Sequence, residues 1–290
     1  MFLETTLLFK TMLILCSQLS IILGVCFYCI REARKAYENN TSFAGIYFRG
    51  SMNMNKQLDL VPYTPSPEYY PSEMFKQVPS ESDATKSDTI TVMAMNKDQR
   101  KELIKDGYID KQNGRFLGIW FILWFISLFL CTVFASSGIS TQTGIIFFTL
   151  SSITFGPLLA LIMLEMDEND GFNALKIVFL VTLITGFIGF SDIYSFSENR
   201  FIKEFLSISL IGLIGFEFIR SSLKFSRMAI RLKAMFGAFV FSIFLLFDFN
   251  LLRKKSDFGI NDWDTAFNIA FNIYLDIINL LLEILDAMSN

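Results

Sequence analysis

Seven apolar runs, each about 20 residues long, constrain the fold of this chain more than any other feature. A helical run of this length spans the hydrocarbon layer of a bilayer, and the short connections between most of the runs are typical of antiparallel bundles. Because 52% of the 290 residues are also hydrophobic, the sequence predicts an all-α, polytopic membrane bundle with seven transmembrane helices. The runs cover residues 6–30, 116–136, 144–164, 175–190, 205–220, 228–249 and 266–285.

The apolar runs divide the chain into three regions. Residues 1–35 hold the first transmembrane helix, interpreted as retained because Glu4 stands near its start without a positive cluster and no small-residue cleavage site follows. Residues 36–115 form a polar insertion. Residues 116–290 hold the other six spans, which form a six-helix membrane bundle.

The polar insertion is rich in proline and tyrosine. Five of the six prolines lie between Pro62 and Pro79, which predicts an extended segment rather than a folded domain. The insertion can serve as a linker or as a strap that contacts protein partners through residues 36–115. Within it, residues 89–95 predict a short strand, and Asn96 is predicted to cap a helix over residues 97–105.

The residue types that are missing exclude several functions. The sequence has no histidine, which excludes His-ligated metals and Ser-His or Cys-His catalysis. The four cysteines lie in apolar runs, without metal-cluster spacing, and no dinucleotide or P-loop motif occurs. The net charge of -3 argues against a nucleic-acid partner. The two-aspartate motifs of intramembrane proteases are absent too, so we predict no enzyme and no cofactor, with Ca²⁺ as the one candidate ion.

The last apolar run carries a polar stripe made of Asn268, Asn272, Asp276, Asn279 and Glu283. Spacings of four, four, three and four residues place these side chains within an arc of about 80° on a helix. A carboxylate in the middle of a membrane helix costs about 2.5–3.5 kcal/mol on insertion scales, so it normally faces the bundle interior or water. The stripe therefore either joins helices through hydrogen bonds or forms an ion or proton site.

Two other apolar runs carry acids. Asp248 ends the preceding run, and because consecutive antiparallel helices are usually neighbours, it is the predicted companion of Asp276. Two adjacent carboxyl groups would share a proton near neutral pH or, when ionised, form a candidate Ca²⁺ site; alternatively, Asp248 only caps its helix. Glu217 is followed one turn later by Arg220, which predicts an ion pair rather than a role in a pore.

Three motifs resemble those of the Bax inhibitor-1 family. Residues 270–280, AFNIYLDIINL, are similar to the last-helix signature A-L-N-I-Y-L-D-I-I-N-L-F of that family. Residues 247–252, FDFNLL, resemble its F/Y-D-T-Q-L-L motif, and residues 154–159, TFGPLL, resemble a G-P-L-L stretch. The resemblance is specific over about residues 230–290, weak over 116–230 and absent before 116.

The resemblance implies a seven-helix bundle with the last helix at its centre and an aspartate pair that latches a pH-sensitive Ca²⁺ or H⁺ leak. Carried over by motif, that pair is Asp248 and Asp276. The supporting polar side chains are Asn250, Asn272, Asn279 and Glu283. Members of the family occupy the endoplasmic reticulum, the Golgi or the mitochondrial inner membrane, and several restrain cell death, so the resemblance leaves the organelle open.

The sequence also departs from the family. Phe249-Asn250 replaces T-Q, no arginine lies inside the second or third span to act as a latch partner, and the insertion at 36–115 is atypical. These departures favour an alternative function, a non-catalytic accessory subunit of a large membrane complex such as a mitochondrial respiratory assembly. The leak predicts a continuous polar path past both aspartates, whereas the accessory subunit predicts a plugged path and an interface on the insertion.

Overall fold

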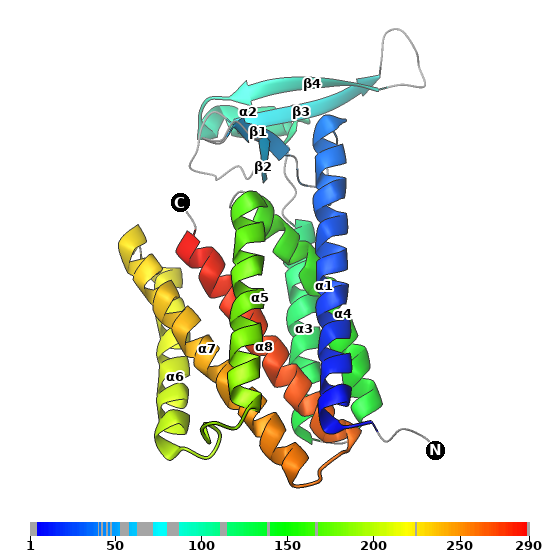
Figure 1. Ribbon diagram of the computed structural model, residues 1–290. Coiled ribbons are helices and arrows are strands. Elements are labelled where there is room, and N and C mark those ends of the chain that lie inside the picture. Colours follow the sequence, from blue (N-terminus) through cyan, green and yellow to red (C-terminus); the bar gives the residue numbers. More distant parts are fainter. Residues whose placement is uncertain are drawn as a thin grey trace. The chain divides into compact units, whose positions relative to one another are not determined.

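The computed structural model, drawn in Figure 1, describes residues 5–39, 41, 43–44, 46, 48–52, 58–62, 72–79, 87–110, 115–137, 140–165, 168–223 and 225–288. The chain divides into two compact units. One unit comprises Met1–Cys26 with Leu123–Asn290, and the other comprises Phe27–Ile122. The two units are described separately below.

Helices account for nearly all of the larger unit. Within the described residues, six helices are long and apolar enough to cross a membrane, which confirms a helical membrane bundle in a lipid environment. They are α1 (Leu7–Glu38), α3 (Arg115–Ser137), α4 (Thr141–Glu165), α5 (Glu168–Phe190), α7 (Arg227–Asp257) and α8 (Trp263–Met288). The seventh predicted span is the helix α6 (Arg200–Ser222), which is not among the six, so the count of seven is not confirmed.

The helix α8 is the most buried of the six candidate spans. In its apolar 18-residue stretch 72% of the residues are buried, against 22% in the corresponding stretch of α5. It packs against α4, α5 and, most extensively, α7, and Figure 1 shows it lying among these helices. Phe148 of α4 meets the ring edges of Phe267, Phe271 and Tyr274 of α8, with ring centroids 4.6–6.1 Å apart. This aromatic contact fixes the N-terminal half of α8 against α4.

A close approach between α5 and α7 positions the end of α7. A Cβ atom on Gly189 would lie 2.6 Å from the carbonyl oxygen of Leu246, so the two backbones can meet only at a glycine. The next turn of α7 carries Asp248 and Asn250. The packing of α5 thus determines where these two polar side chains lie.

The smaller unit contains two antiparallel sheets in its described part. The strand β1 (Phe48–Met52) pairs with β2 (Leu58–Pro62), and a second sheet has the order β4-β3-β5. Its strands are β3 (Ser72–Pro79), β4 (Ser87–Ala94) and β5 (Ile109–Asp110). The prediction of a short strand near residues 89–95 is confirmed by β4.

The prediction of an unfolded, extended insertion is corrected by these sheets. Residues 72–79 form β3, which is paired on both sides, and Met74 at its centre is fully buried. Of the five prolines in this stretch, the structure describes Pro62, which ends β2, and Pro79, which ends β3. At an end a proline removes few ladder hydrogen bonds, so the strands tolerate it. Residues 63–71, the centre of the proline-rich stretch, lie outside the described residues.

The helix α2 (Lys97–Lys105) has the predicted bounds and the predicted cap. The side chain of Asn96 accepts a hydrogen bond from the backbone N–H of Gln99 at 2.8 Å. The side chain of Gln99 in turn accepts one from the backbone N–H of Met95 at 2.9 Å. The local sequence therefore determines where this helix begins.

Candidate functional site

The structure brings Asp248 of α7 and Asp276 of α8 together. The two side chains are in hydrogen-bonding contact with each other, and they are only 6% and 8% exposed. A hydrogen bond between two carboxyl groups requires a proton on one of them, because ionised carboxylates only accept. A proton on either carboxyl group would allow a hydrogen bond between α7 and α8, the two helices that pack against each other most extensively.

The surroundings of the pair leave part of its hydrogen-bonding capacity unused. Oδ2 of Asp276 has no hydrogen-bond partner among the described residues. Lys255, two turns further along α7, interacts electrostatically with Asp248. The family pattern implies a cationic partner for the aspartate pair on an earlier helix, whereas Lys255 lies on α7 itself and was not predicted.

The side chain of Asn250 faces away from the aspartate pair and anchors the connection between α5 and α6. It is fully buried, and it accepts hydrogen bonds from the backbone N–H and the hydroxyl of Ser197 at 3.0 and 2.8 Å. Its amide nitrogen donates to Gly189, Asp192 and Tyr194 at 3.1–3.3 Å. Residues 248 and 250 are about 200° apart around a helix, so adjacency in the motif does not place them in one site. The supporting role of Asn250 at the ion site stays a prediction.

The first part of the polar stripe on α8 joins helices. The side chain of Asn268 donates to the backbone carbonyl of Ala135 on α3 at 3.0 Å, and the exposed Asn272 donates to Asn268 at 3.3 Å. At this end of the stripe the side chains join helices, which is one of the two roles predicted for it. The ionisable part begins at Asp276, one turn later.

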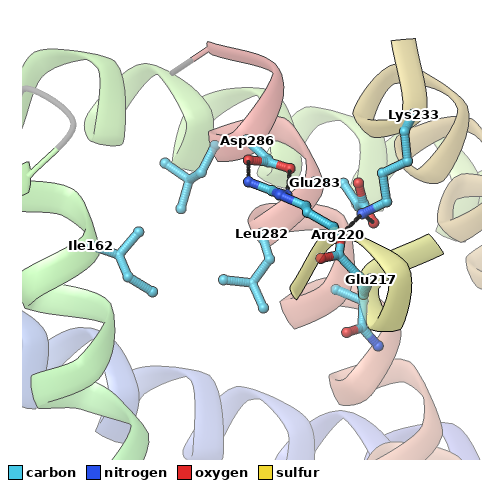
Figure 2. Close-up of a pocket in the computed structure, with 9 residues that line it drawn as sticks. Ile162, Glu217, Arg220, Lys233, Leu282, Glu283 and Asp286 are labelled. Carbon is cyan, nitrogen blue, oxygen red and sulfur yellow. Dashed lines mark hydrogen bonds and ion pairs between the residues drawn. The ribbon is translucent and has the colours of Figure 1, made fainter. Parts of the chain in front are cut away.

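A second group of charged side chains, which we name the charged cluster, lies around the C-terminal end of α8. Lys233 of α7 contacts the carboxylates of both Glu217 and Glu283, the latter at 2.7 Å, and its side chain is 9% exposed. Arg220 of α6 holds Asp286 through two hydrogen bonds of 2.6 and 3.1 Å. Figure 2 shows the two basic side chains reaching toward acids of α8 from two different helices.

The charged cluster lines a cavity of about 360 Å³, to which Asn279, Ile162 and Leu282 also contribute. The predicted ion pair between Glu217 and Arg220 is present at 3.5 Å, but Glu217 also contacts Lys233. The sequence analysis assigned Lys233 no partner. The signal that could have found it is the pair of acids at Glu283 and Asp286, one turn apart on the same helix.

A polar column thus runs along α8 from the aspartate pair to the charged cluster. Asp276 and Glu283 are two turns, or about 10.5 Å, apart along the axis, and Asn279 lies between them. In the described part of the chain, no group of three or more His, Cys, Asp or Glu side chains is arranged to hold a metal ion. Calcium usually takes six to eight oxygen ligands.

The fold and this column define a polytopic helical membrane protein with a buried pair of acids at its core. The family model described as "Inhibitor of apoptosis-promoting Bax1" matches residues 89–290, which is more than half of the chain. The chain belongs to the Bax inhibitor-1 family. The match begins well before the region where the motifs suggested it, and it takes in β4 and α2 as well as both aspartates. A comparison with curated proteins finds no match.

Proposed function

We propose that this chain is a pH-sensitive leak for Ca²⁺ or H⁺, gated by Asp248 and Asp276. The observation that carries the proposal is the direct contact of two buried carboxyl groups on the two most extensively packed helices. In the closed state the shared proton holds α7 against α8. Membership of the family supports the assignment of these two residues to the gate.

The opening step follows from electrostatics. When the proton leaves to water, two negative charges face each other in a low-dielectric interior, where their repulsion is strong. The charges are stabilised if the helices separate, if water enters, or if a divalent cation moves between them. We therefore expect flux to be low at acidic pH and to rise as the pH increases.

The experiment is Ca²⁺ and H⁺ flux into liposomes containing the purified chain, from about pH 6 to about pH 8. Asp248→Asn and Asp276→Asn should each abolish the pH dependence, because an amide cannot release the proton. Lys203→Met, a change at an exposed residue of α6 that has no role in the site, should leave the pH profile unchanged. Flux that varies with pH in the same way in both aspartate variants would refute the gate.

A second candidate function is that of an accessory subunit of a large membrane complex. The observation that favours it is the aromatic packing on the N-terminal side of Asp276, where Phe148, Phe267 and Phe271 are all buried and fill the space between α4 and α8. In this case residues 36–115 contact the partner proteins. Purification of the tagged full-length chain from native membranes, beside a variant with residues 36–115 replaced by a flexible linker, should then show partners that only the full chain retains.

The organelle and any restraint of cell death belong to these proposals. An inner-mitochondrial location is expected for the accessory subunit, and an endoplasmic-reticulum or Golgi location is expected for a calcium leak. Imaging of the tagged chain beside markers of each membrane separates the two.

A further inference from the structure

The charged cluster continues into an apolar groove. The groove has a volume of about 510 Å³ and shares Glu217, Asn279 and Glu283 with the cavity of the cluster. It opens at the surface of the bundle, because Ile214 and Phe218 in its wall are 60% and 80% exposed. Its apolar wall consists of Leu210, Leu213, Ile214 and Phe218 of α6 and Phe241 of α7.

The position of the two cavities along the helices matches the profile of a lipid. The charged end lies where α6 and α8 finish, at Ser222 and Met288, and where α7 begins, at Arg227. From Glu217 the apolar wall extends seven residues back to Leu210, which is about 10.5 Å along α6. A polar head at the helix ends and an apolar chain below it would fill both spaces.

The charges of the cluster favour an amine over an anion. Glu217, Glu283 and Asp286 face Arg220 and Lys233, so the acids outnumber the bases when all are ionised. Oε2 of Glu283 is buried and has no hydrogen-bond partner among the described residues, and the whole residue is 8% exposed. A buried acceptor of this kind is costly to leave unpaired. A ligand that donates a hydrogen bond to it is therefore preferred.

Gly237 of α7 holds the Glu283 carboxylate in place. A Cβ atom at this position would lie 2.4 Å from the carboxylate carbon of Glu283 and 2.7 Å from each of its oxygens. The carboxylate can thus rest directly against the backbone of α7 only because the residue there is glycine. A larger residue in place of Gly237 would therefore displace the Glu283 carboxylate without changing any charge.

We propose that the groove and the charged cluster bind a phospholipid with a primary-amine, zwitterionic headgroup of the phosphatidylethanolamine class. The ammonium group donates to Oε2 of Glu283, the phosphate lies near Arg220 and Lys233, and one acyl chain occupies the groove. A choline headgroup has no N–H to donate, and a purely anionic headgroup meets an excess of acids. The site does not depend on the proposed leak.

The test is native mass spectrometry of the purified chain in detergent, titrated with phosphatidylethanolamine or phosphatidylcholine of identical acyl chains. One charge-assisted hydrogen bond should give a preference of about tenfold for the ethanolamine lipid. Glu283→Gln should abolish the preference while leaving some binding of both lipids. Gly237→Ala, which keeps every charge and moves the carboxylate, should do the same, and Gly215→Ala, with no atom near its Cβ, is its control.

The groove is tested by a matched pair of changes on α6. Ile214→Trp fills the groove and should weaken the binding of both lipids at least several-fold, whereas Ile211→Trp, also exposed on α6 but outside the groove, should not. Equal affinity of the native chain for the two headgroups would overturn the proposal. An equal effect of the two tryptophan changes, or the absence of bound lipid, would overturn it as well.

Discussion

Asp276 and Glu283 are both buried acids of α8, two turns apart, yet their partners differ completely. Asp276 faces another carboxyl group, that of Asp248, and one of its oxygens is unpaired. Glu283 faces the ammonium group of Lys233 at 2.7 Å. The first contact joins two acids, whereas the second joins an acid of α8 to a base of α7.

One helix thus carries two different contacts, a pair of carboxyl groups and an ion pair. If the Asp248–Asp276 contact holds a shared proton, as proposed above, its state changes with pH. The Lys233–Glu283 pair instead joins two opposite charges, which stabilise each other. Substitutions can separate the two contacts, and the largest effect is expected at the ion pair.

Lys233→Met should cause the largest loss of stability. It leaves Glu283 buried beside Glu217 without a counter-charge, which should cost about 3–5 kcal/mol in the free energy of unfolding. Chemical denaturation in detergent measures the loss, with Lys203→Met, an exposed lysine of α6, as the control. If the two variants lose the same small amount of unfolding free energy, the Lys233–Glu283 pair does not stabilise the fold. The contrast with the aspartate pair then disappears.

Asn250→Ala should destabilise the fold by about 1–3 kcal/mol, because it leaves buried groups of the α5–α6 connection unpaired. The pH profile of flux should not change, because this side chain faces away from Asp248. Denaturation and liposome flux measured on the same preparation check both statements. A shifted pH profile would mean that Asn250 belongs to the gate after all.

Asp262→Ala should cost about 1 kcal/mol at neutral pH, since Asp262 caps the start of α8 outside the membrane-spanning segment. Hydrogen bonds from the backbone N–H and the hydroxyl of Thr265 lower the pKa of Asp262 below its ordinary value. Its contribution is therefore present above the ordinary pKa and is lost as the pH falls through the lowered one. The unfolding curves of the native chain and of Asp262→Ala should differ at neutral pH and coincide at acidic pH. Asp262→Asn, whose side chain caps the helix but does not titrate, is the control.

Asp276→Asn should change the stability least, by less than about 1 kcal/mol, because an amide of the same shape keeps a hydrogen bond to Asp248 and no counter-charge is lost. Denaturation at neutral pH measures the change. A loss as large as that of Lys233→Met would mean that Asp276 is part of a fixed ion pair.

The sequence predicted the parts of the fold that depend on length and periodicity. Apolar runs set the membrane helices, and the Asn96 cap set the start of α2, because each signal is local. The pairing of Asp248 with Asp276 also followed, since consecutive antiparallel helices usually pack together. The sheets around β3 did not follow, because strand pairing depends on partners that are distant in the sequence.

The charged cluster could not be predicted for a similar reason. Lys233, Glu217 and Glu283 come from three helices, and only the rotation of each helix about its axis brings them together. The hydrogen-bond partners of Asn250 could not be predicted from the motif either, because a motif gives the order of residues along the chain and not their direction around the helix. A helical projection of residues 247–252 would have separated Asn250 from Asp248.

Infrared spectroscopy of the protonated carboxyl band, followed against pH in the same liposomes used for flux, would observe the shared proton itself. We predict that the native chain keeps one protonated carboxyl group at neutral pH and loses it as flux rises. Glu283→Gln should leave the band unchanged, and Asp276→Asn should abolish its titration. A band that is absent at neutral pH, or that titrates without any change in flux, would contradict the gate formed by Asp248 and Asp276.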